Sequence, residues 1–247
     1  MAKSQSLAAQ AGLTNEVKLP AMFEAPVQVD ARSTCPYVTF AHPLSKLWGK
    51  IVGKYPDVSD GQPFLVDGDS ITKLSPMKYS LMTAKQYWAK GDQEGLTDVS
   101  LSERHDFKEN VEAVVLLFVD GRVMPASCQF RSVKTGAIHP MVTALEQAQT
   151  PAWADLSPAH KETLVCQKPF MRFYGEVTIL PARTSKSSGY KYTPATVTVK
   201  PTAVAEWRVL AEHFNGESDQ SKAFYAKLEE AADVFKRRID EVVAKAK

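Results

Sequence analysis

The chain has 247 residues, 44% of them hydrophobic and 23% charged, and its formal net charge is +2. This length and composition are typical of a soluble globular protein with one large domain or two small ones. The nearly balanced charge excludes a protein that coats nucleic acid with a uniformly basic surface, so any contact with nucleic acid must be local.

The N-terminal segment and the cysteines indicate a cytoplasmic protein. Residues 1–30 are rich in Ala, Ser and Gln without periodicity, and we predict a flexible arm there. The arm lacks the apolar core of a secretory signal, and the longest apolar run, Ala113 to Val119, is too short to span a bilayer. Cys35, Cys128 and Cys166 are widely spaced, which favours buried thiols over disulfides or a zinc site.

The first third of the chain predicts short elements separated by turns. We expect a strand at Tyr37–Phe40 and a helix at Ser45–Val52, with the serine as its N-cap. Asp60-Gly61 and Asp67-Gly68 are turn signals on either side of the apolar sequence PFLV and indicate a hairpin edge. The polar stretch Lys90–Asn110 contains two glycines and predicts an exposed loop.

A hairpin and a helix form the predicted centre of the fold. Glu112–Val119 is a nearly continuous apolar run, typical of a buried strand, and Asp120-Gly121 is a strong hairpin turn. Val123–Phe130 alternates between two faces, although Pro125 indicates that this strand lies at an edge or carries a bulge. Pro140–Gln149 predicts a helix with its proline in the first turn.

Two later strands each predict an apolar face and a polar, aromatic face. The apolar faces contain Met171, Phe173, Val177 and Ile179 in one strand and Ala195, Val197 and Val199 in the other. The opposite faces contain Arg172, Tyr174, Glu176 and Thr178, and Tyr190, Tyr192, Thr196, Thr198 and Lys200. Gly175 interrupts the first strand and indicates a bulge or sharp bend, as a small barrel requires.

The C-terminal part predicts helices. One follows Pro201 from Thr202 to Phe214 and stops at Asn215-Gly216. A longer one, capped by Ser218, continues to Lys247 and carries an apolar stripe at three- and four-residue spacing. A helix of this length is marginal unless its stripe is buried, so we expect it to pack on its own barrel, with self-association of the protein as the alternative.

The sequence carries no motif of a known enzyme class. It lacks GxGxxG, Walker A, GxSxG and HExxH patterns. Four of the five histidines have no cysteine or carboxylate at ligand spacing, and His105, beside Glu103 and Asp106, lies in a polar loop. We therefore predict no catalytic residues, no metal site and no cofactor.

Basic and aromatic residues are concentrated near the two later strands. Between Lys161 and Lys200 there are seven Lys or Arg residues against two Glu, interleaved with aromatic rings. Cations neutralise phosphates and rings stack on bases, so this composition favours binding of unpaired nucleotides. The alternative is an ordinary half-exposed hairpin with Tyr and Lys on its wet side. The predicted contacts are Lys168, Arg172, Tyr174, Arg183, Lys186, Tyr190, Lys191 and Tyr192.

The order of features from Phe118 to Val199 resembles a set of phage and mobile-element proteins. The matching segments are LLFVDGRVMPASCQF, SVKTGAIHPMVTAL, FMRFYGEVTIL and SGYKYTPATVTV, preceded by PYVTFAHPLSKLWGKI and GQPFLVDGD. Some of these proteins look like single-stranded DNA-binding proteins of replication and recombination modules, built on an OB-type barrel. This chain lacks the cysteine cluster of some members, and it ends in the basic KRRIDEVVAKAK instead of the acidic tail that often recruits replication enzymes.

Together these features predict an α+β protein with an OB-like, mostly antiparallel β-barrel followed by C-terminal helices. We expect an N-terminal arm at 1–30, a β domain with one inserted helix at 31–200 and a helical segment at 201–247. The resemblance implies non-sequence-specific binding of single-stranded DNA in phage or mobile-element replication or recombination, in the bacterial cytoplasm and without membrane contact. The alternatives are a virion structural or assembly protein without nucleic-acid binding and, less favoured, a small enzyme such as a nuclease.

Overall fold

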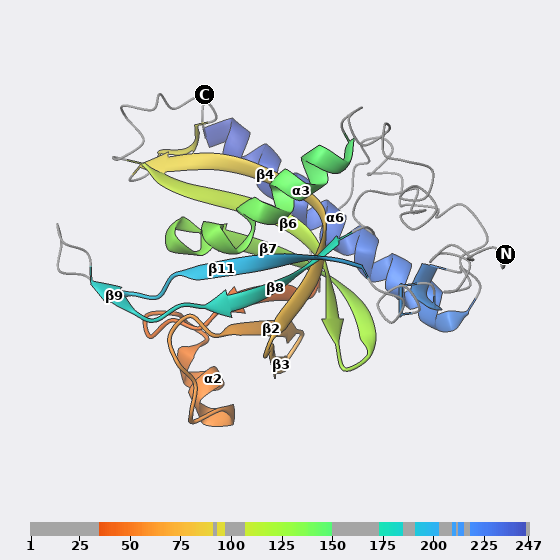
Figure 1. Ribbon diagram of the computed structural model, residues 1–247, viewed down its shortest axis with the longest axis horizontal. Helices are drawn as coiled ribbons and strands as arrows, with labels where there is room; N and C mark the ends of the chain where they lie inside the picture. Colours follow the sequence, from red (N-terminus) through yellow and green to blue (C-terminus); the bar gives the residue numbers. More distant parts are fainter. Residues whose placement is uncertain are drawn as a thin grey trace, which may run out of the picture.

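The protein is built on one large, curled and mostly antiparallel sheet, seen in the computed structural model of Figure 1. The structure describes residues 35–90, 93–96, 107–149, 173–184, 191–202, 209–210, 212–214 and 218–245. Together with the long C-terminal helix, the sheet confirms the predicted α+β class. The predicted arm at 1–30 lies outside the described residues.

The described elements follow one another along the chain with few long connections. The strands of the main sheet are β1 (Tyr37–Phe40), β2 (Pro63–Asp67), β3 (Ser70–Lys73), β4 (Met77–Lys90), β5 (Gln93–Leu96), β6 (Lys108–Val119), β7 (Arg122–Arg131), β8 (Phe173–Ile179) and β11 (Ala195–Pro201). Their order is β11-β8-β4-β6-β7-β1-β2-β3, with β5 paired to β4. A separate ribbon joins β9 (Arg183–Thr184) to β10 (Lys191–Tyr192). The helices are α2 (Trp48–Lys54), the 3-10 helix η3 (Ser132–Ala137), α3 (His139–Gln149) and α6 (Asp219–Lys245).

The β6–β7 hairpin confirms the local signals of the sequence. Asp120 and Gly121 have φ values of 48° and 74°, the left-handed conformation that a tight hairpin turn needs. In β7, Ala126, Cys128 and Phe130 share the core face, as the alternation predicts. The hairpin therefore fixes which side of the sheet each residue faces.

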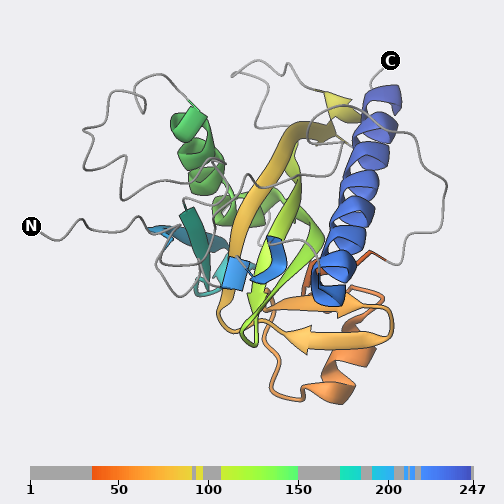
Figure 2. The ribbon, with the colours of Figure 1, turned by 90° about the vertical axis from the view of Figure 1, so that its right-hand side faces the viewer.

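Two layers of helix cover the sheet, one on each face. Figure 2 shows α3 on one side of the strands and α6 along the other. On the α3 side, Met141 packs in a cluster with Tyr79 and Phe130, and the Tyr79 hydroxyl donates a hydrogen bond to the Ala137 carbonyl at 2.6 Å. On the α6 side, a second cluster includes Leu116 of β6. Burial on both faces explains why β6 reads as a continuous apolar run.

Helix α6 packs on its own sheet, as predicted. The Ser218 hydroxyl accepts a hydrogen bond from the Ser221 N–H at 3.1 Å, which confirms the expected N-cap. Phe224, Leu228 and Ala231 are buried in the cluster on this face of the sheet. Among the described residues, no helix is both long and apolar enough to cross a bilayer.

Three local predictions need correction. Helix α2 begins at Trp48 with Leu47 as N-cap, and the Ser45 hydroxyl instead accepts a hydrogen bond from the Leu47 N–H at 3.2 Å in the preceding turn. The end of the predicted loop Lys90–Asn110 is the start of β6, because Asn110 is buried opposite β4. Both errors arise because tertiary pairing overrides local composition.

Gly175 does not form a bulge. Its pairing with β11 and β4 continues without a register shift. A Cβ atom at this position would lie 2.5 Å from Val197 Cγ2 and 3.0 Å from Met141 Sδ. The glycine is therefore required because α3 approaches the sheet closely at this point, and the strand needs no bend there.

The pairing of β1 with β7 positions the site. β1 runs parallel to β7 but pairs with it only at Ser127 and Cys128, and then turns away to pair with β2. No residue of β1 pairs opposite Pro125, which agrees with the edge character that the proline predicts. Beyond Cys128 the two strands diverge and leave a fork in the sheet.

Candidate functional site

A groove of about 1480 Å³ opens at this fork. It is lined by β1, the adjoining ends of β6 and β7, the 3-10 helix η3, strand β10 and the second half of α6. Strand alternation directs the backbone N–H of Arg131 toward the fork, because Ser127, of the same parity, donates its N–H to the Pro36 carbonyl at 2.9 Å. Divergence of two strands thus creates a groove that no single segment of sequence encodes.

The groove is strongly basic. Six Lys or Arg side chains line it against two acidic ones, Asp60 and Glu112, in a chain whose formal net charge is only +2. The six are Lys108, Arg131, Lys134, Lys191, Arg237 and Arg238. Such a local excess raises the concentration of anions in the groove.

Only some of these cations are available to a ligand. The Lys134 amino group donates to the Thr193 carbonyl, and burial lowers its pKa while Asp60 partly offsets that effect. Arg238 is held by carboxylates, as described below. In the described part of the chain, Lys108, Lys191 and Arg237 form no ion pair, and the Nε of Arg237 is buried without a hydrogen-bond acceptor. A buried donor without an acceptor is costly, which favours an anionic ligand beside it.

Aromatic and apolar side chains lie among the cations. Tyr37 is exposed, and Phe40, Tyr192 and Phe235 are half-buried in the lining. Lys134 lies over the Phe40 ring with its nitrogen 5.6 Å from the ring centre. The groove therefore offers both ring surfaces on which bases can stack and charges for phosphates.

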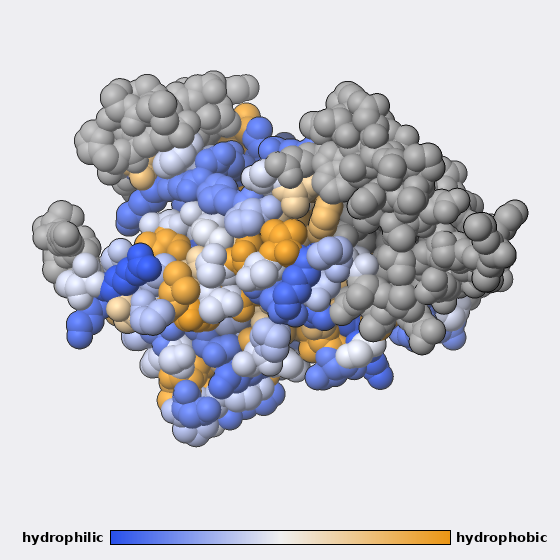
Figure 3. All heavy atoms as spheres, viewed as in Figure 1, coloured by the Kyte–Doolittle hydropathy of each residue, from blue (hydrophilic) through white to orange (hydrophobic). Residues whose placement is uncertain are grey.

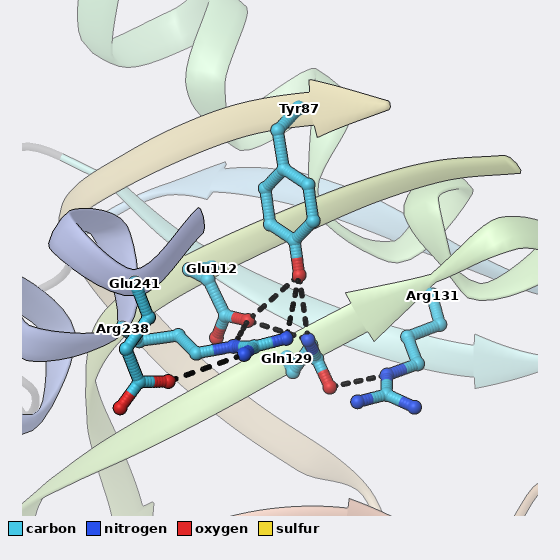
Figure 4. Close-up of polar contacts among 6 residues, drawn as sticks. All are labelled: Tyr87, Glu112, Gln129, Arg131, Arg238 and Glu241. Atoms are coloured by element: carbon cyan, nitrogen blue, oxygen red, sulfur yellow. Dashed lines mark hydrogen bonds and ion pairs between the residues drawn. The ribbon is translucent and has the colours of Figure 1, made fainter. Parts of the chain in front are cut away.

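A polar network forms the bottom of the groove (Figure 4). Figure 4 shows the Tyr87 hydroxyl directed at Glu112, Gln129 and Arg238, which come from three different elements. The hydroxyl donates to Glu112 Oε1 at 3.1 Å and accepts from Gln129 Nε2 at 2.8 Å. The Nε of Arg238 lies 3.2 Å from the same carboxylate oxygen, and its Nη1 lies 3.4 Å from Glu241. Gln129 also accepts a hydrogen bond from Arg131 Nε, which orients that guanidinium.

Burial controls the protonation of this network. It raises the pKa of Glu112, and the hydrogen bonds from Tyr87, Arg238 and Gln129 only partly counteract that effect. Burial, followed by the nearby Glu112 carboxylate, raises the pKa of Tyr87 to about 12. The tyrosine therefore acts as a neutral hydrogen-bonding group, and the Glu112–Arg238 pair adds little net charge to the bottom of the groove.

The structure brings together two of the eight predicted contact residues. Lys191 and Tyr192 line the groove on β10. Arg183 is exposed on β9, where it pairs with Tyr192, and the hydrophilic projection at the left of Figure 3 lies where Figure 1 places this ribbon. The other predicted contacts, apart from Tyr174, lie outside the described residues: Lys168, Arg172, Lys186 and Tyr190.

The predicted exposure of Tyr174 is wrong. The side chain faces away from the α3 cluster as predicted, but it is only 8% exposed. Its ring contacts Phe118 at 6.3 Å between centres, and the Lys78 amino group lies 4.3 Å from its centre. Tyr174 therefore packs within the protein and does not line the groove.

Most of the groove was not predictable from a local pattern. Lys108, Arg131 and Arg237 lie in three separate elements and are adjacent only through the sheet and the packing of α6. The basic run Lys236–Arg238 was the one available signal, and it was interpreted only as a basic end of the chain. In the described ranges, no group of three or more His, Cys, Asp or Glu side chains is placed to hold a metal ion.

Comparison of the chain with protein-family models, curated proteins and solved structures gives no match. The function is therefore inferred from the chemistry of the groove.

Proposed function

We propose that this protein binds single-stranded DNA along the groove, without strong sequence preference. The observation that carries this proposal is the groove lining, with six basic side chains against two acidic ones and with rings among them. The setting that we propose is replication or recombination of a phage or mobile element in the bacterial cytoplasm, with the curled sheet serving as an OB-type platform. This setting rests on the sequence resemblance described above.

The distribution of burial favours an unpaired strand. Lys108, Arg131 and Lys191 are exposed, whereas Asn110 and Glu112 at the bottom are buried. Phosphates would follow the exposed cations, and bases would turn inward toward the rings and the uncharged polar groups. A duplex keeps its bases stacked inside and its phosphates outside, so it cannot make both sets of contacts.

The available cations give an expected salt dependence. Lys108, Arg131, Lys191 and Arg237 remain after the two internally held cations are set aside. If each meets one phosphate, the slope of log K against log[salt] should be about −3, at roughly −0.7 for each contact with a single strand.

The test is a titration of the protein with fluorescent oligo-dT, with unlabelled duplex DNA as competitor. Arg131→Gln and Lys191→Gln should each weaken binding and reduce the slope by about 0.7. Lys222→Gln is the matched control, because Lys222 is a cation on the first turn of α6 outside the groove. Absence of oligo-dT binding at low salt would contradict the proposal and favour an assembly protein.

A further inference from the structure

A rigid turn presents an apolar side chain at the edge of the groove. The Ser45 N–H donates to the His42 carbonyl at 2.8 Å and closes the turn. The Leu44 N–H donates to His42 Nδ1 at 3.2 Å, and Pro43 fixes the backbone before it. Leu44 at the tip is 85% exposed. The turn therefore holds a leucine in solvent with little conformational freedom in its backbone.

Exposed apolar side chains gather around this groove. Four large hydrophobic residues are exposed in the described part of the chain: Tyr37, Leu44, Val133 and Val243. The first three line the groove, and only Val243 does not. An isolated exposed leucine needs no explanation, but a cluster at the edge of a basic groove indicates an interaction site.

We propose that Leu44 contacts the last base pair of a duplex where it meets the single strand held in the groove. This inference rests on the proposed function and specifies its substrate as a junction between single- and double-stranded DNA. Apolar side chains such as leucine are used elsewhere as wedges against base steps, because base faces are apolar once unstacked. At a junction the terminal pair exposes one such face, and the adjoining single strand leads into the groove.

Charge next to the turn favours a nucleic-acid occupant over an apolar protein surface. Lys46 and Lys50 follow Leu44 closely and are both exposed. They lie outside the groove lining and so are available to the phosphates of a duplex beside it. A second copy of the chain would instead have to bring two lysines next to its own basic groove, which is electrostatically unfavourable.

The test compares three fluorescent DNAs of equal dT length: a single strand, a blunt duplex and a duplex with a dT tail. A 2-aminopurine base at the terminal pair reports unstacking. The wild-type protein should prefer the tailed duplex, and Leu44→Ser should weaken that binding by about fivefold to tenfold while oligo-dT affinity stays unchanged. Val243→Ser, an exposed apolar residue away from the groove, is the control and should have no effect.

The outcomes separate this inference from the proposed function. Unchanged oligo-dT binding with no preference for the tailed duplex and no 2-aminopurine signal overturns the junction site alone. Loss of all oligo-dT binding in the wild type overturns the proposed function. A smaller particle mass for Leu44→Ser, with unchanged DNA binding, assigns the turn to self-association and also overturns the junction site.

Discussion

Removal of Arg238 should destabilise the protein through the carboxylate that it leaves behind. Arg238→Met keeps much of the aliphatic side chain but removes the contacts with Glu112 at 3.2 Å and Glu241 at 3.4 Å. The Glu112 side chain is only 11% exposed, so water replaces the lost guanidinium poorly. The variant thus leaves a largely buried negative charge without its cation.

The expected size of the effect follows from this partial burial. Removing one partner of a fully buried ion pair costs about 3–5 kcal/mol. The Arg238 side chain is 23% exposed, and Tyr87 and Gln129 still donate to the carboxylate, so we expect a loss of about 2–3 kcal/mol. The double variant Glu112→Gln/Arg238→Met removes the charge as well and should recover about 1–2 kcal/mol of that loss.

The loss should depend on pH with a defined sign. The pKa of Glu112 in the folded protein is raised above its ordinary 4.5, so the folded state binds more protons than the unfolded state in the window above that value. Stability therefore falls as pH rises through the window. Loss of Arg238, whose contacts lower this pKa, widens the window upward, so the variant is penalised most at about pH 8 and least at about pH 5.

Urea denaturation of the wild type, both single variants and the double variant at the two pH values measures these quantities. Subtracting the wild-type values removes the contribution of the other carboxylates. An equal loss for Arg238→Met at both pH values, or a double variant no more stable than Arg238→Met, would show that the uncompensated Glu112 charge is not the cause.

Three further expectations concern packing and the corrected site. Gly175→Ala should cost about 1–3 kcal/mol in urea denaturation because its methyl group meets packed side chains, whereas Gly53→Ala, with open space around it in α2, should be neutral or stabilising by up to about 1 kcal/mol; equal effects would contradict the close approach. Tyr174→Ala should lower the melting temperature and spare oligo-dT affinity, whereas Tyr192→Ala should spare melting and weaken binding by about 1–3 kcal/mol; the reverse result would place the binding surface on the other side of β8. Leu228→Ala should cost about 2–5 kcal/mol if α6 completes the core, and a change in particle mass alone would assign the helix to oligomerisation.

The local sequence determined the elements whose signals are short-range. The run Glu112–Val119, the turn Asp120-Gly121 and the alternation of β7 define a hairpin without reference to the rest of the chain. The stripe of α6 and its Ser218 cap likewise define the helix and its buried face. These predictions succeeded because backbone hydrogen bonds and side-chain periodicity are set by neighbours within a few residues.

Only the tertiary structure decided which faces are covered and where the groove lies. Period-two alternation placed Tyr174 on the face opposite the α3 cluster, but Lys78 and Phe118 from other strands bury it there. The groove exists because β1 leaves β7 after two paired residues and α6 brings Arg237 to the resulting fork. Long-range pairing and packing set such distances, and a single sequence contains no local signal for either.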